Sequence, residues 1–76
     1  MNRLTEVREA QGIRKSEMAR RLNIHRSEYG RIEERMDQGI RGTTPELADQ
    51  IAKEFGNAVT RDQILFPKDY MEQKAS

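Results

Sequence analysis

The sequence predicts an all-α domain built from five short helices. Apolar residues recur at intervals of three or four positions through most of the chain, which is the period of an α-helix. No segment shows the alternation of apolar and polar residues that predicts a β-strand. Glycine, proline and asparagine separate the helical segments, and 76 residues are enough for a single domain.

The first helix is expected over about residues 3–11. Asn2 is a suitable N-cap, because its side chain can accept a hydrogen bond from a free amide of the first turn. Gly12 suits the position just past the helix end. Leu4 and Val7 supply the buried stripe of this helix.

A pair of short amphipathic helices joined by a tight turn is predicted next, over about residues 15–22 and 26–34. Asn23 lies in the turn, where a left-handed backbone is needed and asparagine tolerates it better than most residues. Neither Arg14 nor His25 is a good N-cap. The apolar residues expected to face one core are Met18, Ala19, Leu22, Ile24, Tyr29 and Ile32. Two such helices, with basic residues near the start of the second, are typical of a helix-turn-helix that reads DNA.

The helical period breaks over residues 35–43, which contain two glycines and are predicted to form a loop. The fourth helix is clearly marked, with Thr44 as N-cap, Pro45 at its first position and Gly56 at its end. Its buried face is expected to consist of Leu47, Ile51, Ala52 and Phe55.

The fifth helix is predicted from a capping box in which Thr60 and Gln63 each bond the other's backbone amide. Pro67 is expected to end this helix. Residues 1–67 therefore form the predicted domain, and residues 68–76 are expected to be a polar, frayed tail.

The net charge of +1 is small, but it is unevenly distributed. Residues 1–35 hold nine Lys/Arg against six Asp/Glu, a net of +3, whereas residues 36–66 hold three against five, a net of −2. Basic charge is therefore concentrated in the half with the predicted helix-turn-helix, as binding to DNA through one face requires. The alternative is that exposed helix surfaces are simply charged.

Composition argues against several classes of protein. With no cysteine, the chain has no disulfide, thiol nucleophile or thiolate metal site, which fits a reducing compartment. One histidine, no phosphate-binding glycine loop and no metal-ligand spacing indicate a protein that is not an enzyme and has no cofactor, metal or small-molecule ligand. No apolar run approaches the length of a signal sequence or membrane span, so a cytoplasmic protein is expected.

Four short motifs follow one another along the chain. They are Arg8 with Gly12-Ile13, Met18-Ala19 with Leu22, Ile32-Glu33, and Leu47 with Ile51-Ala52 and Phe55. Through these motifs the chain resembles the lambda-repressor-like helix-turn-helix family, the Cro and phage-repressor type also called XRE, over roughly residues 4–65. The resemblance implies a five-helix DNA-binding domain with its helix-turn-helix at the second and third helices. It also implies a sequence-specific transcriptional regulator, most similar to a Cro-like repressor of phage or prophage, that binds a palindromic operator in double-stranded DNA as a homodimer.

The third helix is the recognition helix in this family, and the resemblance places Arg26, Ser27 and Arg31 where base edges are read. Arginine can bond guanine O6 and N7 together, and serine can bond several bases. Glu28 has three interpretations: it accepts from cytosine N4, it repels phosphate and so excludes wrong sequences, or it takes no part in binding. The alternative for both arginines is an ordinary solvated surface.

Phosphate or groove contacts are expected from five further residues. They are Lys15, Arg14, His25, Arg35 and Arg41. The first three cluster at the start of the second helix and in the turn, and such contacts supply affinity and register rather than base reading. The last two flank the glycine-containing loop, which runs along the DNA backbone in the family. The alternative for that loop is mobility without contact.

Other positions are expected to act on structure or assembly. In the family a salt bridge ties the first helix to the end of the third, and the resemblance assigns it to Arg8 and Glu33. Val59 and Phe66 are the candidates for a dimer contact. Gly30 lies inside the third helix, where glycine costs about 1 kcal/mol relative to alanine.

The alternative function is a protein-interaction module of the same fold, such as the antitoxin of a toxin–antitoxin pair. The tail after Pro67 would then fold on a partner protein. Removal of residues 68–76 would distinguish the two functions, because a DNA-binding domain does not need a partner-binding tail to bind its operator.

Overall fold

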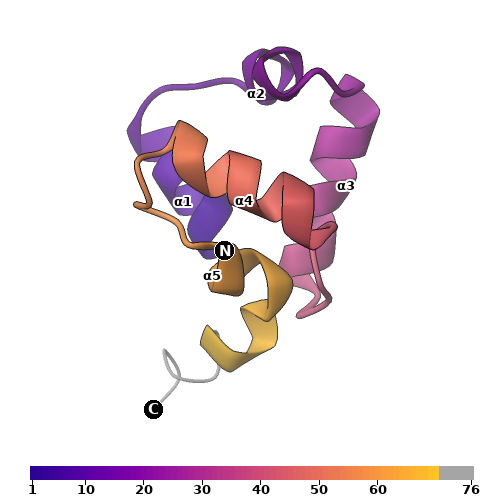
Figure 1. Ribbon diagram of the computed structural model, residues 1–76, viewed down its shortest axis with the longest axis vertical. Coiled ribbons are helices and arrows are strands. Elements are labelled where there is room, and N and C mark those ends of the chain that lie inside the picture. The colour runs from indigo at the N-terminus through magenta and orange to yellow at the C-terminus, as the bar shows by residue number, and fades with distance from the viewer. Residues whose placement is uncertain (71–76) are drawn as a thin grey trace.

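The computed structural model describes residues 1–70, which form five α-helices and contain no strand (Figure 1). The helices are α1 (Arg3–Ala10), α2 (Lys15–Leu22), α3 (Arg26–Asp37), α4 (Pro45–Glu54) and α5 (Arg61–Leu65). The prediction of an all-α domain is therefore confirmed. Helix α2 packs on α3 and also contacts α4, while α5 packs on α4 and α1. This arrangement leaves one long side of α3 at the edge of the molecule (Figure 1).

One apolar core joins all five helices. Its buried members are Leu4, Val7, Met18, Ala19, Leu22, Tyr29, Ile32, Met36, Ala48, Ile51, Phe55, Val59, Ile64 and Leu65. Ala48 is fully buried, whereas the predicted core residue Leu47 is only half-buried against the cluster. The small Ala48 side chain allows α4 to lie close to its neighbours, so Leu47 covers the edge of the core.

The turn between α2 and α3 has the geometry that its sequence predicts. Asn23 adopts the left-handed conformation, with φ 59° and ψ 43°, and ends α2. The Ile24 amide then donates to the Ala19 carbonyl at 2.9 Å, so Ile24 turns back to pack on the core. The chain changes direction steeply between α2 and α3 within three residues, which fixes the start of α3 against the end of α2 (Figure 1).

His25 caps α3, which corrects the prediction that it is a poor N-cap. Its ring Nδ1 accepts a hydrogen bond from the Ser27 amide at 3.2 Å, satisfying one of the free donors at the helix start. An imidazole nitrogen can therefore take the place of the usual hydroxyl or carboxylate oxygen. Arg14, as expected, begins α2 without a side-chain cap.

Helix α3 ends at Asp37, three residues beyond its predicted end. Met36 is fully buried and extends the inward stripe of Tyr29 and Ile32 by one turn. The Asp37 Oδ1 accepts from the backbone amide of Asn2 at 3.1 Å and from its side-chain nitrogen at 2.8 Å. These contacts, across more than thirty residues of sequence, stabilise the last turn, so the predicted loop begins at residue 38 and not at residue 35.

The caps of the other helices match their sequence signals. Asn2 accepts from the Thr5 amide, Thr44 accepts from the Leu47 amide, and Thr60 with Gln63 forms the predicted capping box.

The first residues after α5 are helical rather than frayed. Residues 67–70 form a further helical turn that begins at Pro67, and Pro67 is itself buried. Proline ends a helix but also suits the first position of the next one, and here it does both. The rest of the predicted tail, residues 71–76, lies outside the described residues.

Candidate nucleic-acid interface

The outward face of α3 carries two of the predicted base-reading residues. Because Tyr29, Ile32 and Met36 point into the core, the opposite side of the helix is formed by Ser27, Gly30, Arg31 and Glu34. Ser27 and Arg31 are exposed and one turn apart. Both side chains can therefore reach the same segment of a groove.

Arg26 and Glu28 lie beside that face, on opposite flanks of the first turn of α3. Residues two positions apart on a helix point about 200° away from each other, and both side chains are exposed. They therefore cannot contact the same base pair together. The start of α3 thus presents Arg26 on one side, Ser27 in the middle and Glu28 on the other side.

Glu34 is a member of the outward face that the sequence interpretation missed. It lies seven residues after Ser27 and three after Arg31, and it is exposed. The interval of seven was visible in the sequence, but the helix was expected to end at this residue. A carboxylate here repels phosphate, so the first half of α3 is the part suited to enter a groove of DNA.

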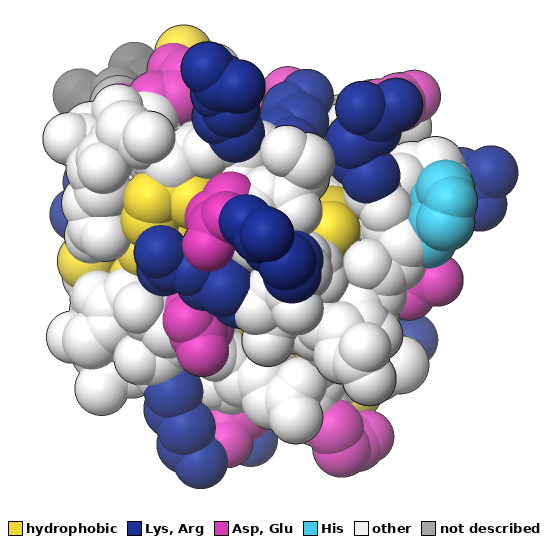
Figure 2. Space-filling view, turned by 90° about the horizontal axis from the view of Figure 1, so that it is seen from above, with side chains coloured by type: hydrophobic (Ala, Val, Ile, Leu, Met, Phe, Trp, Pro, Cys, Tyr) yellow, Lys and Arg dark blue, Asp and Glu magenta, His cyan; other side chains and the backbone are white. Residues whose placement is uncertain are grey.

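His25 and Ser27 are joined at the start of α3. The imidazole Nδ1 lies 2.8 Å from the Ser27 hydroxyl oxygen and also accepts from the Ser27 amide. The histidine is exposed at one edge of the face seen in Figure 2, with Lys and Arg side chains near it. Any contact of Ser27 with a base would therefore compete with, or act through, this imidazole.

Five predicted contact residues carry positive charges that have no partner among the residues that the structure describes. Within residues 1–70, no side-chain hydrogen bond or ion pair is formed by Arg14, Lys15, Arg26, Arg31 or Arg41. Other cations are engaged: Arg20 and Arg21 bind Glu17 on α2, and Lys53 binds Asp49 on α4. Of the other described arginines, Arg61 alone is also unpaired.

Arg35 does not belong with these free cations. It lies in the last turn of α3, half-buried, and its Nη1 donates to the Gly42 carbonyl at 3.3 Å. Its own carbonyl accepts from the Ile40 amide at 2.9 Å. Arg35 thus holds the loop of residues 38–44 against α3, whereas Arg41 in that loop is exposed and free to contact a ligand.

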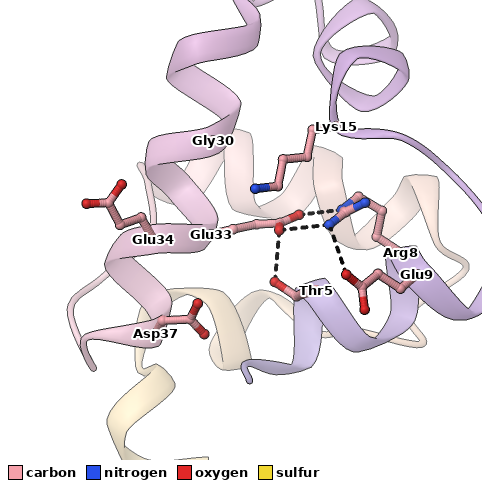
Figure 3. A pocket seen from close by; sticks show the side chains of 8 residues that line it. All are labelled: Thr5, Arg8, Glu9, Lys15, Gly30, Glu33, Glu34 and Asp37. Atoms are coloured by element: carbon pink, nitrogen blue, oxygen red, sulfur yellow. Dashed lines mark hydrogen bonds and ion pairs between the residues drawn. The ribbon is translucent and has the colours of Figure 1, made fainter.

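A buried ion pair connects α1 to the inner side of α3. The Arg8 Nε donates to Glu33 Oε2 at 2.6 Å, and Arg8 Nη2 donates to Oε1 at 3.1 Å (Figure 3). The Thr5 hydroxyl donates to the same Oε1 at 2.8 Å, and Arg8 Nη1 donates to the Ile13 carbonyl at 2.8 Å. The pair therefore ties together α1, the chain leading into α2, and α3.

The ionisation of this pair follows from its contacts. Burial by itself would raise the pKa of Glu33, but the hydrogen bond from Arg8 above all, supported by the neighbouring hydroxyl groups and by the charge of Arg8, brings it below its ordinary value. The hydrogen bond with Glu33 raises the pKa of Arg8. The adjacent hydroxyl of Tyr29 makes no hydrogen bond within residues 1–70, and burial raises its pKa, so it stays neutral.

A hollow of about 310 Å³ opens beside the ion pair, between α1, the start of α2 and one flank of α3 (Figure 3). Its lining residues are Thr5, Arg8, Glu9, Lys15, Gly30, Glu33, Glu34 and Asp37. The ammonium of Lys15 overhangs it from the α2 side, and Gly30 lies on the α3 side (Figure 3). Within residues 1–70, no group of acidic, histidine or cysteine side chains could hold a metal ion.

The two predicted dimer residues are in different environments. Val59 is fully buried in the core and is not available to a second subunit, so that prediction was wrong. A single sequence cannot tell an apolar residue of a core from one of an interface when it lies in a short connection. Phe66 is 55% exposed, and Ile40, which the sequence interpretation placed in the loop without a role, is 51% exposed.

Comparison with known proteins gives one match. A family model described as helix-turn-helix matches residues 4–60, three quarters of the chain. No curated protein and no solved structure matches the sequence. Among the described residues, no helix has the length and apolar character needed to cross a bilayer.

Proposed function

The chain belongs to the lambda-repressor-like, or XRE-type, helix-turn-helix family of DNA-binding regulators, and we propose that it acts as a sequence-specific, Cro-like repressor on a palindromic operator. The observation that carries this proposal is the distribution of free positive charge. The unpaired cations among the described residues gather on α3, at the start of α2 and in the loop after α3, with Arg61 as the exception.

Base reading is assigned to the first half of α3. Arg31 and Ser27 point outward together, and Arg26 flanks them, so an arginine can form the paired bonds to guanine while the serine contacts a neighbouring base. Glu28, on the flank away from Arg26, can accept from a cytosine amino group or exclude other sequences.

Phosphate contacts are assigned to Lys15 and Arg14 at the start of α2, and to Arg41 in the loop. All three are exposed and unpaired within the part of the chain that the structure describes. A charged side chain that has no intramolecular partner does not have to break an ion pair in order to bind a phosphate. Such contacts place the protein on the duplex and make binding depend on salt.

We propose that two subunits bind together, each with α3 in the major groove of one half-site. A two-fold symmetric dimer of this motif requires half-sites about 34–36 Å apart, one turn of DNA. The exposure of Phe66 supports a contact with a second copy of the chain at this end of the molecule, because a large aromatic side chain is normally buried. Occupancy of the operator would then block transcription directly.

Selection from random duplex DNA, followed by footprinting, tests the proposal. It predicts one consensus with two-fold symmetry, half-sites one helical turn apart, and binding that weakens steeply with added salt. A selection that yields no consensus would overturn the proposal of sequence-specific binding. A consensus without symmetry would overturn the homodimer.

A further inference from the structure

At four of the five glycine positions, the fold itself explains why glycine is present. Gly12, Gly39 and Gly56 have positive φ angles of 69°, 77° and 57°, which other residues rarely adopt. Gly42 lies against the core, where an added Cβ would come within 2.9 Å of Met36 Cγ. At each of these positions the fold itself disfavours a side chain, through the backbone conformation at the first three and through core packing at Gly42.

Gly30 has no such reason. It lies in the interior of α3, it is not among the residues with positive φ, and an added Cβ would meet nothing within 4 Å. Glycine inside a helix lowers the folding equilibrium constant roughly fivefold relative to alanine. The free protein would therefore be more stable with alanine at this position, and no contact with the described residues opposes the change.

The location of Gly30 indicates why a side chain is absent at this position. It follows Ser27 by one turn and precedes Arg31 on the outward face of α3, and it also lines the hollow that Lys15 overhangs (Figure 3). A glycine allows the backbone of a helix to come unusually close to a ligand. Lys15 supplies a positive charge beside that point.

We propose that Gly30 is the point of closest approach between α3 and DNA, where a sugar-phosphate segment of one strand occupies the space that a Cβ would fill. The strand lies on the Lys15 side of the hollow, because the carboxylates of Glu9, Glu34 and Asp37 border the other part and would repel a phosphate there, while Glu33 is neutralised by Arg8 (Figure 3). This inference rests on the proposed function. It makes Gly30 a positioning residue that sets how deeply Arg31 and Ser27 enter the groove.

The test compares Gly30→Ala and Gly30→Leu with the wild type on the selected operator duplex. Gly30→Ala is expected to raise the melting temperature by about 4–8 °C. It should nevertheless raise Kd at least tenfold, and Gly30→Leu should raise Kd further. Gln50→Ala, at an exposed position of α4, is the matched control and should leave Kd unchanged.

The salt dependence separates steric exclusion from loss of charge. Gly30→Ala should leave the slope of log Kd against log salt unchanged, whereas Lys15→Ala should reduce it by about one unit. Unchanged operator affinity of Gly30→Ala would overturn the inference while leaving the proposed function intact. A lowered melting temperature would also overturn it, since the position would then matter to the fold. If the wild type selects no operator, the proposed function itself fails.

Discussion

The Arg8 guanidinium donates two hydrogen bonds to the Glu33 carboxylate, from Nε to Oε2 at 2.6 Å and from Nη2 to Oε1 at 3.1 Å. Both residues are more than nine-tenths buried. Glu33 projects from the inner flank of α3, whose outer face carries Arg31. The same ion pair therefore stabilises the fold and fixes the orientation of the helix proposed to read DNA.

Removal of one partner should affect stability and binding together. Arg8→Ala leaves a buried carboxylate without its counter-charge, so we expect a loss of about 3–5 kcal/mol in the free energy of unfolding, measured by denaturant titration. Operator affinity should fall in the same variant at a temperature where it remains folded. Arg20→Ala, which breaks an exposed ion pair with Glu17, should cost less than about 1 kcal/mol.

Two results bear on the structural role of Arg8. The double variant Arg8→Met with Glu33→Leu replaces both charges by apolar groups and should recover much of the lost stability. Wild-type melting temperature in Arg8→Ala, together with lost binding, would show that Arg8 contacts DNA directly and would contradict the account.

Stability should depend on pH through Glu33. Its folded-state pKa lies below the ordinary value of 4.5, so the folded protein keeps the carboxylate charged at pH values where the unfolded chain is protonated. This contribution is fully present above about pH 5 and is lost as the pH falls through the folded-state pKa. The contribution of Glu33 is measured by comparing the thermal unfolding of the wild type with that of Glu33→Gln between pH 7 and pH 3. An equal decline in both proteins would show that other carboxylates carry the effect.

The Tyr29 hydroxyl should contribute nothing to stability. It is buried without a hydrogen bond among the described residues, and a buried polar group without a partner costs free energy. Tyr29→Phe keeps the packing of the ring, so the free energy of unfolding is expected to stay the same or to rise by up to about 1 kcal/mol. Tyr70→Phe, at a half-buried position, is the control. A loss of more than about 1 kcal/mol would instead indicate that the hydroxyl bonds Glu33.

Local sequence signals were enough for the starts of most helices. Caps such as Asn2, Thr44 and Thr60 act within three residues, so they can be recognised without the fold. The end of α3 could not be predicted in this way, because it depends on Met36 reaching the core and on Asp37 meeting Asn2 from the far end of the chain.

The candidate site was predictable in part. The helical period of the apolar residues and the positions of the charged residues were enough to place exposed cations on the second and third helices. The family resemblance supplied the pairing of Arg8 with Glu33. The engagement of Arg35 with the Gly42 carbonyl could not be predicted, since it depends on how the loop folds back. The burial of Val59 likewise follows from tertiary packing alone.

If the outward face of α3 reads base sequence, selection from random duplex DNA with matched arginine variants will show it. Wild type, Arg31→Ala and Arg61→Ala, an exposed and unpaired arginine on α5, are compared at one salt concentration. Arg31→Ala is expected to lose preference at one position of each half-site, with a cost of about 1–3 kcal/mol for the cognate base. Arg61→Ala should keep the wild-type consensus. The same consensus from wild type and Arg31→Ala would contradict base reading by this face.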